Sequence, residues 1–320
     1  MTAKTVTCAV LMSVIAATAQ AAPPVHIQQD DAAGTLTVNI SDKLAMQYQY
    51  GDQWAIPHFW PVNTPSGKNL LEQKAQPPEK FPHHRAMWVV DHVRLAGQPD
   101  VDFYHEWRNY IDRAHPEKGH KHYIRHQAFD NVKSDGESAS YDESLKWIVN
   151  QQTPVLDEHR HVKVHALGEG EYLIDWSWKL TASYGDVRFN SDWVHYAWPY
   201  VRINHTFNGE HGGTITADNG DTGRKDTDGK YYNWIDYSNT VDGTPEGLAV
   251  FIYPDGEKHK WLTREYGCFG PRRADAFSGT HFMLKKGESI GGHVGILVHR
   301  GNVTDGKVAE RYAQYVEGKL

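Results

Sequence analysis

The stretch YLIDWSWKLT, residues 172–181, alternates large apolar side chains with polar ones along most of its length. Successive side chains of a β-strand point to opposite faces, so this pattern predicts a strand with one buried and one solvated face. Similar runs recur along the chain and are separated by turn-forming residues such as Asp242-Gly243. The predicted strands lie at residues 35–40, 45–50, 86–93, 123–129, 145–149, 161–166, 172–181, 186–193, 213–217, 233–237, 248–253, 280–284 and 290–299.

The pattern contains no alternation of strands with long helices that would build a parallel sheet. One amphipathic helix is predicted over residues 306–316, where Val308, Tyr312 and Tyr315 fall at helical spacing. We therefore expect an all-β fold, a large antiparallel β-sandwich with a short C-terminal helix.

No low-complexity linker or internal repeat marks a domain boundary, so we expect residues 22–320 to form a single domain. Two long polar segments, residues 97–121 and 208–230, interrupt the strand pattern. Connections of that length in a compact domain are often functional.

The N-terminus has the features of a cleaved secretory signal. Lys4 precedes an apolar run at residues 9–17, and Ala19-Gln20-Ala21 resembles a small-residue cleavage site. We expect residues 1–21 to be removed after Ala21, which places the protein in the periplasm or outside the cell. No later segment approaches the roughly 20 apolar residues needed to cross a bilayer, so we expect no membrane insertion.

Cleavage of the signal removes Cys8 and leaves Cys268 alone, which excludes an internal disulfide. The simplest role of Cys268 is that of a small buried hydrophobic residue. The formal charge is −7, and loss of the positive Lys4 makes it −8. This charge argues against nucleic acid as a partner, and the sequence does not indicate an oligomeric state.

The chain contains 11 Trp, 17 Tyr and 20 His. Sheets use many aromatic residues in their cores, but the remainder is large enough to line a cleft for a sugar. His120-x-His122 and His159-x-His161 would each place two imidazoles on one strand face. No cysteine partner or His-Glu-x-x-His pattern accompanies them, so we expect no cofactor, with a metal held by these histidines as the alternative.

The heptad PHHRAMW, residues 82–88, combines two imidazoles, a guanidinium and an indole. Imidazole can move protons near neutral pH, guanidinium can hold an oxyanion, and indole can stack on a sugar ring. Neighbouring side chains of an extended segment point to opposite faces. We therefore expect only one of His83 and His84 to face a substrate.

Several motifs resemble those of a bacterial domain family of unknown function that is commonly labelled methane oxygenase PmoA. The most specific are HFWPVNTPSG at residues 58–67, PHHRAMW at 82–88, VDF at 101–103 and NWIDYS at 233–238. The chain departs from the family pattern at Ala86-Met87 and at Tyr104. The label does not suit it, because a membrane-embedded copper oxygenase needs long apolar helices.

The resemblance implies a secreted β-sandwich of the galactose-mutarotase type, from the context of bacterial glycan degradation. It therefore implies a carbohydrate partner, such as a glycan or an oxidised or uronic sugar. The same resemblance implies that the residues of these motifs are the candidates for the site.

Basic and phenolic groups outnumber carboxyl groups in these motifs, which favours a lyase-like or epimerase-like abstraction of a proton beside a carbonyl or carboxylate. In this mechanism a histidine moves the proton, arginines hold the anionic oxygen, and a tyrosine protonates the leaving oxygen. The expected catalytic residues are His83, His84, Arg85, Tyr237, Arg264 and Tyr266. The expected substrate-binding residues are His58, Asp102, His126, Arg202, Trp234 and Asp236.

Two rival functions stay open. A glycoside hydrolase would use two carboxyl groups, with Asp102 or Glu106 as acid and Asp236 as base. A glycan-binding sandwich without catalysis would use the aromatic residues as a stacking platform. Structural roles also compete, since Arg85 suits a buried ion pair with Asp102 or Asp236, and Trp88 suits a core.

Overall fold

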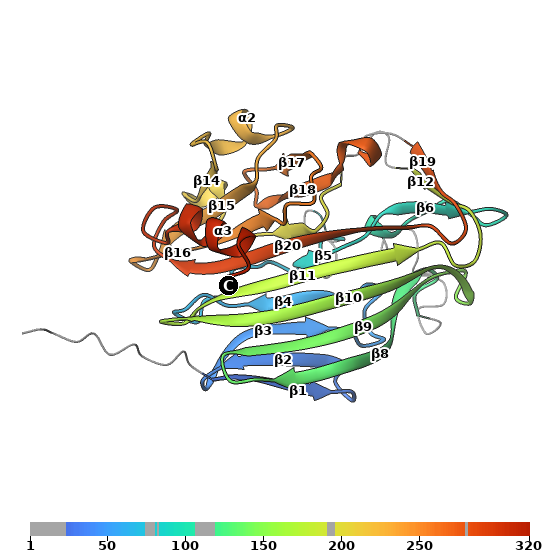
Figure 1. The fold of residues 1–320 in the computed structure, drawn as a ribbon, viewed down its shortest axis with the longest axis horizontal. Helices are drawn as coiled ribbons and strands as arrows, with labels where there is room; N and C mark the ends of the chain where they lie inside the picture. Colours follow the sequence, from blue (N-terminus) through green and yellow to red (C-terminus); the bar gives the residue numbers. More distant parts are fainter. Residues whose placement is uncertain (1–23, 74–80, 82, 106–118, 191–195, 279–280) are drawn as a thin grey trace, which may run out of the picture.

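The computed structural model describes residues 24–73, 81, 83–105, 119–190, 196–278 and 281–320, and the expected signal segment lies outside these ranges. Within them the strands form two eight-stranded antiparallel sheets and a smaller four-stranded sheet. Figure 1 shows the long strands β8 to β11 of one large sheet lying over β1 to β4 of the other.

The first sheet joins N-terminal strands to strands from the second half of the chain. Its order is β1 (Val25–Asp30), β2 (Thr35–Ile40), β3 (Lys43–Gln49), β4 (His58–Val62), β5 (Met87–Trp88), β13 (Tyr200–Arg202), β18 (Cys268–Ala274) and β17 (His259–Thr263).

The second sheet contains the longest strands. Its order is β14 (Thr214–Ala217), β15 (Trp234–Val241), β16 (Thr244–Ile252), β20 (Ser289–Arg300), β11 (Glu171–Thr181), β10 (Thr153–Gly168), β9 (Ser138–Val149) and β8 (Tyr123–Ser134). The third sheet has the order β19 (His281–Leu284), β12 (Val187–Asn190), β6 (His92–Leu95) and β7 (Val101–Asp102).

The two large sheets pack face to face through aromatic side chains. Phe59 of β4 meets Trp176 of β11 with ring centroids 4.9 Å apart, and Phe269 of β18 meets Tyr237 of β15 at 5.5 Å. In β11 the apolar positions of the alternation are buried, whereas Lys179 is exposed. The predicted antiparallel β-sandwich is therefore confirmed.

The predicted C-terminal helix is also confirmed, as α3 (Val308–Val316). Its Val308 and Tyr315 pack against Leu173 and Phe251 of the second sheet. Figure 1 shows α3 lying against this sheet beside β16 and β20. None of the helices in the described ranges is both long and apolar enough to pass through a membrane.

The two long polar segments contain regular structure rather than loop alone. The first includes β7 and the 3-10 helix η1 (Phe103–His105), and its residues 106–118 lie outside the described ranges. The second includes the 3-10 helix η3 (Gly209–His211), β14 and the short helix α2 (Gly223–Thr227). A further 3-10 helix, η4 (Asp275–Phe277), follows β18.

Candidate functional site

The centre of the first sheet carries a cluster of aromatic and titratable side chains on its outer face. Tyr200 pairs with Trp88 across β13 and β5, and their rings lie 4.7 Å apart. Phe269 points into the sandwich, so its strand neighbour Cys268 points outward by the alternation of a strand. Cys268 pairs in register with Arg202, which places Arg202 on the same face.

His84 lies in the middle of a buried hydrogen-bonded chain. Its Nε2 is 3.0 Å from Tyr104 Oη, and its Nδ1 is 3.5 Å from Cys268 Sγ. Phe81 stacks on the imidazole, with ring centroids 4.9 Å apart. Burial lowers the pKa of His84 well below its usual value and raises the pKa of Tyr104 and of Cys268. All three groups are therefore uncharged at neutral pH.

A His–Asp dyad on η1 lies beside the hydrogen-bonded chain of His84. Asp102 Oδ1 accepts the backbone N–H of Tyr104 at 3.0 Å, which caps the short helix. Asp102 Oδ2 lies 2.5 Å from His105 Nδ1 and accepts Tyr196 Oη at 3.0 Å. In the neutral imidazole, donation of the Nδ1–H to this carboxylate leaves the lone pair of His105 on Nε2. The ring centroid of His83 is 4.3 Å from that of His105, so two imidazoles meet at this point.

Arg202 borders the cluster on the side of β18. Its Nη1 donates to the carbonyl of Tyr266 and to Cys268 Sγ, and its Nη2 donates to Glu72 Oε2 at 3.3 Å. The guanidinium lies 4.8 Å from the centroid of the Tyr266 ring. Burial raises the pKa of Tyr266 to about 12. Its phenol therefore keeps its proton at neutral pH and can donate it.

Arg85 and His58 flank the cluster. The Arg85 guanidinium lies 5.6 Å from the centroid of the Trp54 ring, and Trp54 packs edge-on against His58. His58 Nε2 is 2.9 Å from Gln73 Nε2. Burial, and next the charge of Arg85, lower the pKa of His58 to about 3, so this imidazole is neutral.

Asp236 and Trp234 lie on the opposite side of the sandwich. Both alternate along β15 with Tyr237, which points inward, and Trp234 packs in the cluster beneath α3. Asp236 Oδ1 is 2.7 Å from His299 Nε2, and both side chains are buried. The expected convergence of Asp236 with the histidines of the heptad is therefore wrong, because both sheets lie between them. The alternative ion pair of Arg85 with Asp236 is wrong for the same reason.

Three other expected site residues have partners outside the cluster. Tyr237 Oη accepts the backbone N–H of Gly209 at 2.7 Å, in the interior of the sandwich. Arg264 Nη1 is 2.5 Å from Asp228 Oδ2. His126, on the edge strand β8, places its Nδ1 2.8 Å from Glu143 Oε1. Within the described part of the chain, no hydrogen bond joins any of these three side chains to His84 or His105.

The structure thus brings together one group of the expected residues and adds others to it. The expected residues at the cluster or its flank are His58, His83, His84, Arg85, Asp102, Arg202 and Tyr266. Sequence reasoning missed His105, although the spacing Asp102-x-x-His105, which begins at the Asp of the VDF motif, was a usable signal. Glu106 lies outside the described residues. In the described part of the chain, no group of three or more His, Cys, Asp or Glu is placed to hold a metal ion.

Solved structures with similar backbones are distant in sequence. The α-galactosidase AgaB of glycoside hydrolase family 36 from Geobacillus stearothermophilus is 9% identical, with 88% of this chain and 42% of that chain covered and a TM-score of 0.49. The α-galactosidase from Lactobacillus brevis is 8% identical, with 87% and 40% covered and a TM-score of 0.44. A galactose mutarotase related enzyme from Lactobacillus acidophilus is 11% identical, with 86% and 97% covered and a TM-score of 0.39.

The chain spans about two fifths of the length of the two α-galactosidases, 42% and 40%. A search of curated proteins finds no match. The model of one protein family, described as a family of unknown function (DUF6807), matches residues 35–313. The chain therefore belongs to the family DUF6807.

Proposed function

We propose that this protein is a carbohydrate-active enzyme that removes a proton from a carbon beside a carbonyl or carboxylate group, in a lyase-like or epimerase-like reaction. The observation that carries the proposal is the dyad in which Asp102 holds His105 Nδ1 at 2.5 Å, next to the imidazole of His83. A carboxylate that fixes one imidazole nitrogen makes the other nitrogen a directed base.

In the proposed reaction His105 Nε2 takes the proton from the carbon. For an elimination, the electron pair of that C–H bond forms a carbon–carbon double bond as the bond to the leaving oxygen breaks. Tyr266 supplies the proton to the leaving oxygen, which its pKa of about 12 permits. For an epimerisation, Tyr266 supplies a proton to the opposite face of the same carbon, while His105 keeps the proton that it removed.

Charge around the cluster suits an anionic intermediate. Arg202 is a buried cation on this face that is paired with Glu72 and lies directly against the Tyr266 ring, and Arg85 is a second buried cation that donates to the backbone carbonyl of His84. Guanidinium groups in a site of low dielectric stabilise a developing enolate or a substrate carboxylate strongly. Aldoses in the open-chain form and uronic acids provide such a carbon.

The placement of carboxyl groups disfavours the rival hydrolase. Its expected base, Asp236, is paired with His299 on the far sheet, so it is not available opposite Asp102. Hydrolysis with inversion or retention needs two carboxyl groups within about 10 Å of each other. A glycan-binding protein without catalysis remains an outcome that experiment must separate from an enzyme.

The test is a panel of oligosaccharides, including uronate-containing ones, incubated with the wild type and with His105→Gln. We expect a product from at least one uronate-containing substrate, detected by mass spectrometry and by ultraviolet absorbance if an unsaturated bond forms. His105→Gln should lose at least about 100-fold in turnover, in the range of a lost general base.

A matched control is His161→Gln. His161 is also held by an aspartate, with Nδ1 2.6 Å from Asp142 Oδ1, but this pair is exposed on the second sheet. The control should retain full turnover. Binding of a glycan without any product would support the glycan-binding alternative, and equal turnover in His105→Gln would contradict the assignment of the base.

A further inference from the structure

A pocket of about 520 Å³ lies where the three sheets meet. Its lining comes from β11 and β20 of the second sheet, from β17 and β18 of the first, and from β19 of the third. The lining residues do not include His84, His105 or Asp102. The volume falls within the range of about 300–1,000 Å³ that small-molecule sites occupy.

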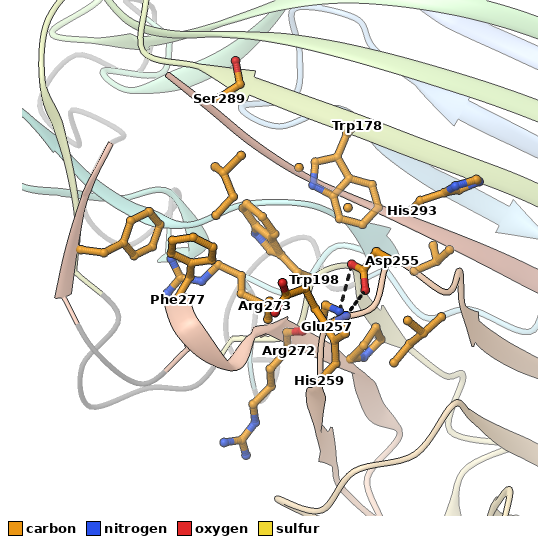
Figure 2. Close-up of a pocket in the computed structure, with 18 of the residues that line it drawn as sticks. Trp178, Trp198, Asp255, Glu257, His259, Arg272, Arg273, Phe277, Ser289 and His293 are labelled. Carbon is orange, nitrogen blue, oxygen red and sulfur yellow. Dashed lines mark hydrogen bonds and ion pairs between the residues drawn. The ribbon is translucent and has the colours of Figure 1, made fainter. Parts of the chain in front are cut away.

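The walls of this pocket are aromatic. Trp178 of β11 and Trp198, just before β13, meet edge to face with ring centroids 5.9 Å apart. Phe277 and Phe282 continue the wall, with centroids 5.0 Å apart. Figure 2 shows Trp178, Trp198 and Phe277 projecting around one space from different parts of the chain. Trp178 and Trp198 are buried, whereas Phe277 is 38% exposed and provides a flat apolar surface on which the C–H face of a sugar packs.

The two indole nitrogens differ in their partners. Trp198 Nε1 donates to the carbonyl of Val90 at 2.9 Å. Trp178 is only 4% exposed, and its Nε1 has no hydrogen-bond partner among the residues that the structure describes. A buried N–H without a partner is unfavourable, and an oxygen of a bound ligand would satisfy it.

The charged groups that open to the pocket are acidic. Asp255, Glu257 and Glu288 belong to the lining, and all three are exposed. Asp255 lies 3.3 Å from His259 Nε2, as the dashed lines of Figure 2 mark. Carboxylates accept hydrogen bonds and can bind the hydroxyl groups of a ligand.

The two lining arginines are each paired with an aspartate outside the lining. Arg272 lies 3.5 Å from Asp228, and Figure 2 shows its guanidinium turned away from the indole rings. Arg273 lies 3.2 Å from Asp91. Arg273 also packs against the rings of Trp198 and Phe282, 5.8 and 4.9 Å from their centroids, but it is buried, whereas the carboxylates of the lining are exposed. The exposed charge that a ligand meets is therefore negative, and it repels anionic ligands.

We propose that this pocket is a second carbohydrate site, which binds a neutral sugar ring. The C–H face of the ring packs against the exposed Phe277, a ring or hydroxyl oxygen accepts the Trp178 N–H, and hydroxyl groups donate to Asp255 and Glu257. A purely apolar ligand would leave the Trp178 N–H unpaired, and an anionic sugar would meet like charge. The proposal does not depend on the proposed function of the histidine cluster.

The test measures binding of maltotriose, cellotriose, xylotriose and mannotriose by tryptophan fluorescence and by saturation-transfer NMR, with trigalacturonate as the anionic counterpart. We expect at least one neutral trisaccharide to bind at least about tenfold more tightly than trigalacturonate. Trp178→Phe keeps an aromatic ring and removes the N–H, so it should weaken that binding about tenfold, as expected for one hydrogen bond.

Two controls locate the site. Trp176 lies on the same face of the same strand and also has a buried Nε1, but it does not line the pocket, so Trp176→Phe should leave affinity unchanged in a protein that folds. His105→Gln should also leave it unchanged, which separates this site from the histidine cluster. The proposal is overturned if no neutral trisaccharide binds, if Trp178→Phe binds as the wild type does, or if His105→Gln abolishes the binding.

Discussion

Asp236 should support the fold through its pair with His299, and replacing it by asparagine tests this. The two side chains are 1% exposed or less, and Ser238 Oγ donates to the second carboxylate oxygen at 2.8 Å. Burial alone lowers the pKa of His299, but the Asp236 carboxylate outweighs it and raises that pKa overall. The folded state therefore favours a charged imidazole beside the carboxylate.

Asp236→Asn keeps the size of the side chain and leaves a buried imidazolium without its counter-charge. Breaking one side of a buried pair costs about 3–5 kcal/mol of unfolding free energy. The matched comparison is Asp142→Asn, which removes the partner of His161 from a pair whose side chains are 39% and 48% exposed. An exposed pair contributes about 1 kcal/mol or less, so the free energy of unfolding of this variant should be close to that of the wild type.

The pH dependence has a definite sign. A histidine whose pKa is raised on folding stabilises the fold fully below its unfolded value, and the contribution disappears as the pH rises through the folded value. The deficit of Asp236→Asn should therefore be largest below the reference pKa of 6.5 and should shrink above it.

Urea unfolding followed by tryptophan fluorescence, on both sides of pH 6.5, measures this deficit. A deficit that matches that of Asp142→Asn, or one that grows with pH, would refute the reasoning.

Three further variants test the structure, namely Gly267→Ala next to Tyr266 of the histidine cluster, its control Gly97→Ala, and Tyr237→Phe. Gly267 has φ +102°, and a Cβ there would lie 2.6 Å from the carbonyl oxygen of Ile203. Gly267→Ala should therefore lower the free energy of unfolding by about 1–3 kcal/mol or more, together with the thermal midpoint. Gly97 has φ +79° and open space where a Cβ would lie, so Gly97→Ala should lower the free energy of unfolding only by the cost of the positive φ, about 1 kcal/mol. Equal losses in the two alanine variants would contradict the role of the contact with Ile203. Tyr237→Phe removes the oxygen that accepts the Gly209 N–H, so it should cost about 1–3 kcal/mol and keep turnover. Loss of turnover in a stable Tyr237→Phe protein would instead make the phenol catalytic.

The strand pattern predicted the fold well where polar residues face solvent and less well where they are buried. The predicted strand 172–181 matches β11 (Glu171–Thr181) except that β11 begins one residue earlier. By contrast only residues 161–166 of β10 were predicted, although the strand begins at Thr153. The reason is the buried ion pair of Arg160 Nε with Glu158 Oε1 at 2.6 Å, which puts charged residues at core positions of the strand.

The site was predictable only where its residues are neighbours in the sequence. The heptad and the VDF motif contain His83, His84 and Asp102, and all three belong to the cluster. Cys268 and Tyr200 join them because β5, β13 and β18 are neighbours in the sheet, an order that no local pattern contains. Motif membership did not imply proximity, because a motif such as NWIDYS holds residues that stabilise the opposite face of the sandwich.

Exchange of a substrate proton with solvent tests most directly whether His105 is the base. A uronate-containing oligosaccharide that the wild type converts is incubated in D₂O, and deuterium at the carbon beside the carboxylate is followed by NMR and mass spectrometry. We expect the wild type and His161→Gln to incorporate deuterium or to form the unsaturated product, and His105→Gln and Asp102→Asn to do neither at a measurable rate while remaining folded. Conversion at the wild-type rate by a folded His105→Gln protein would contradict the assignment.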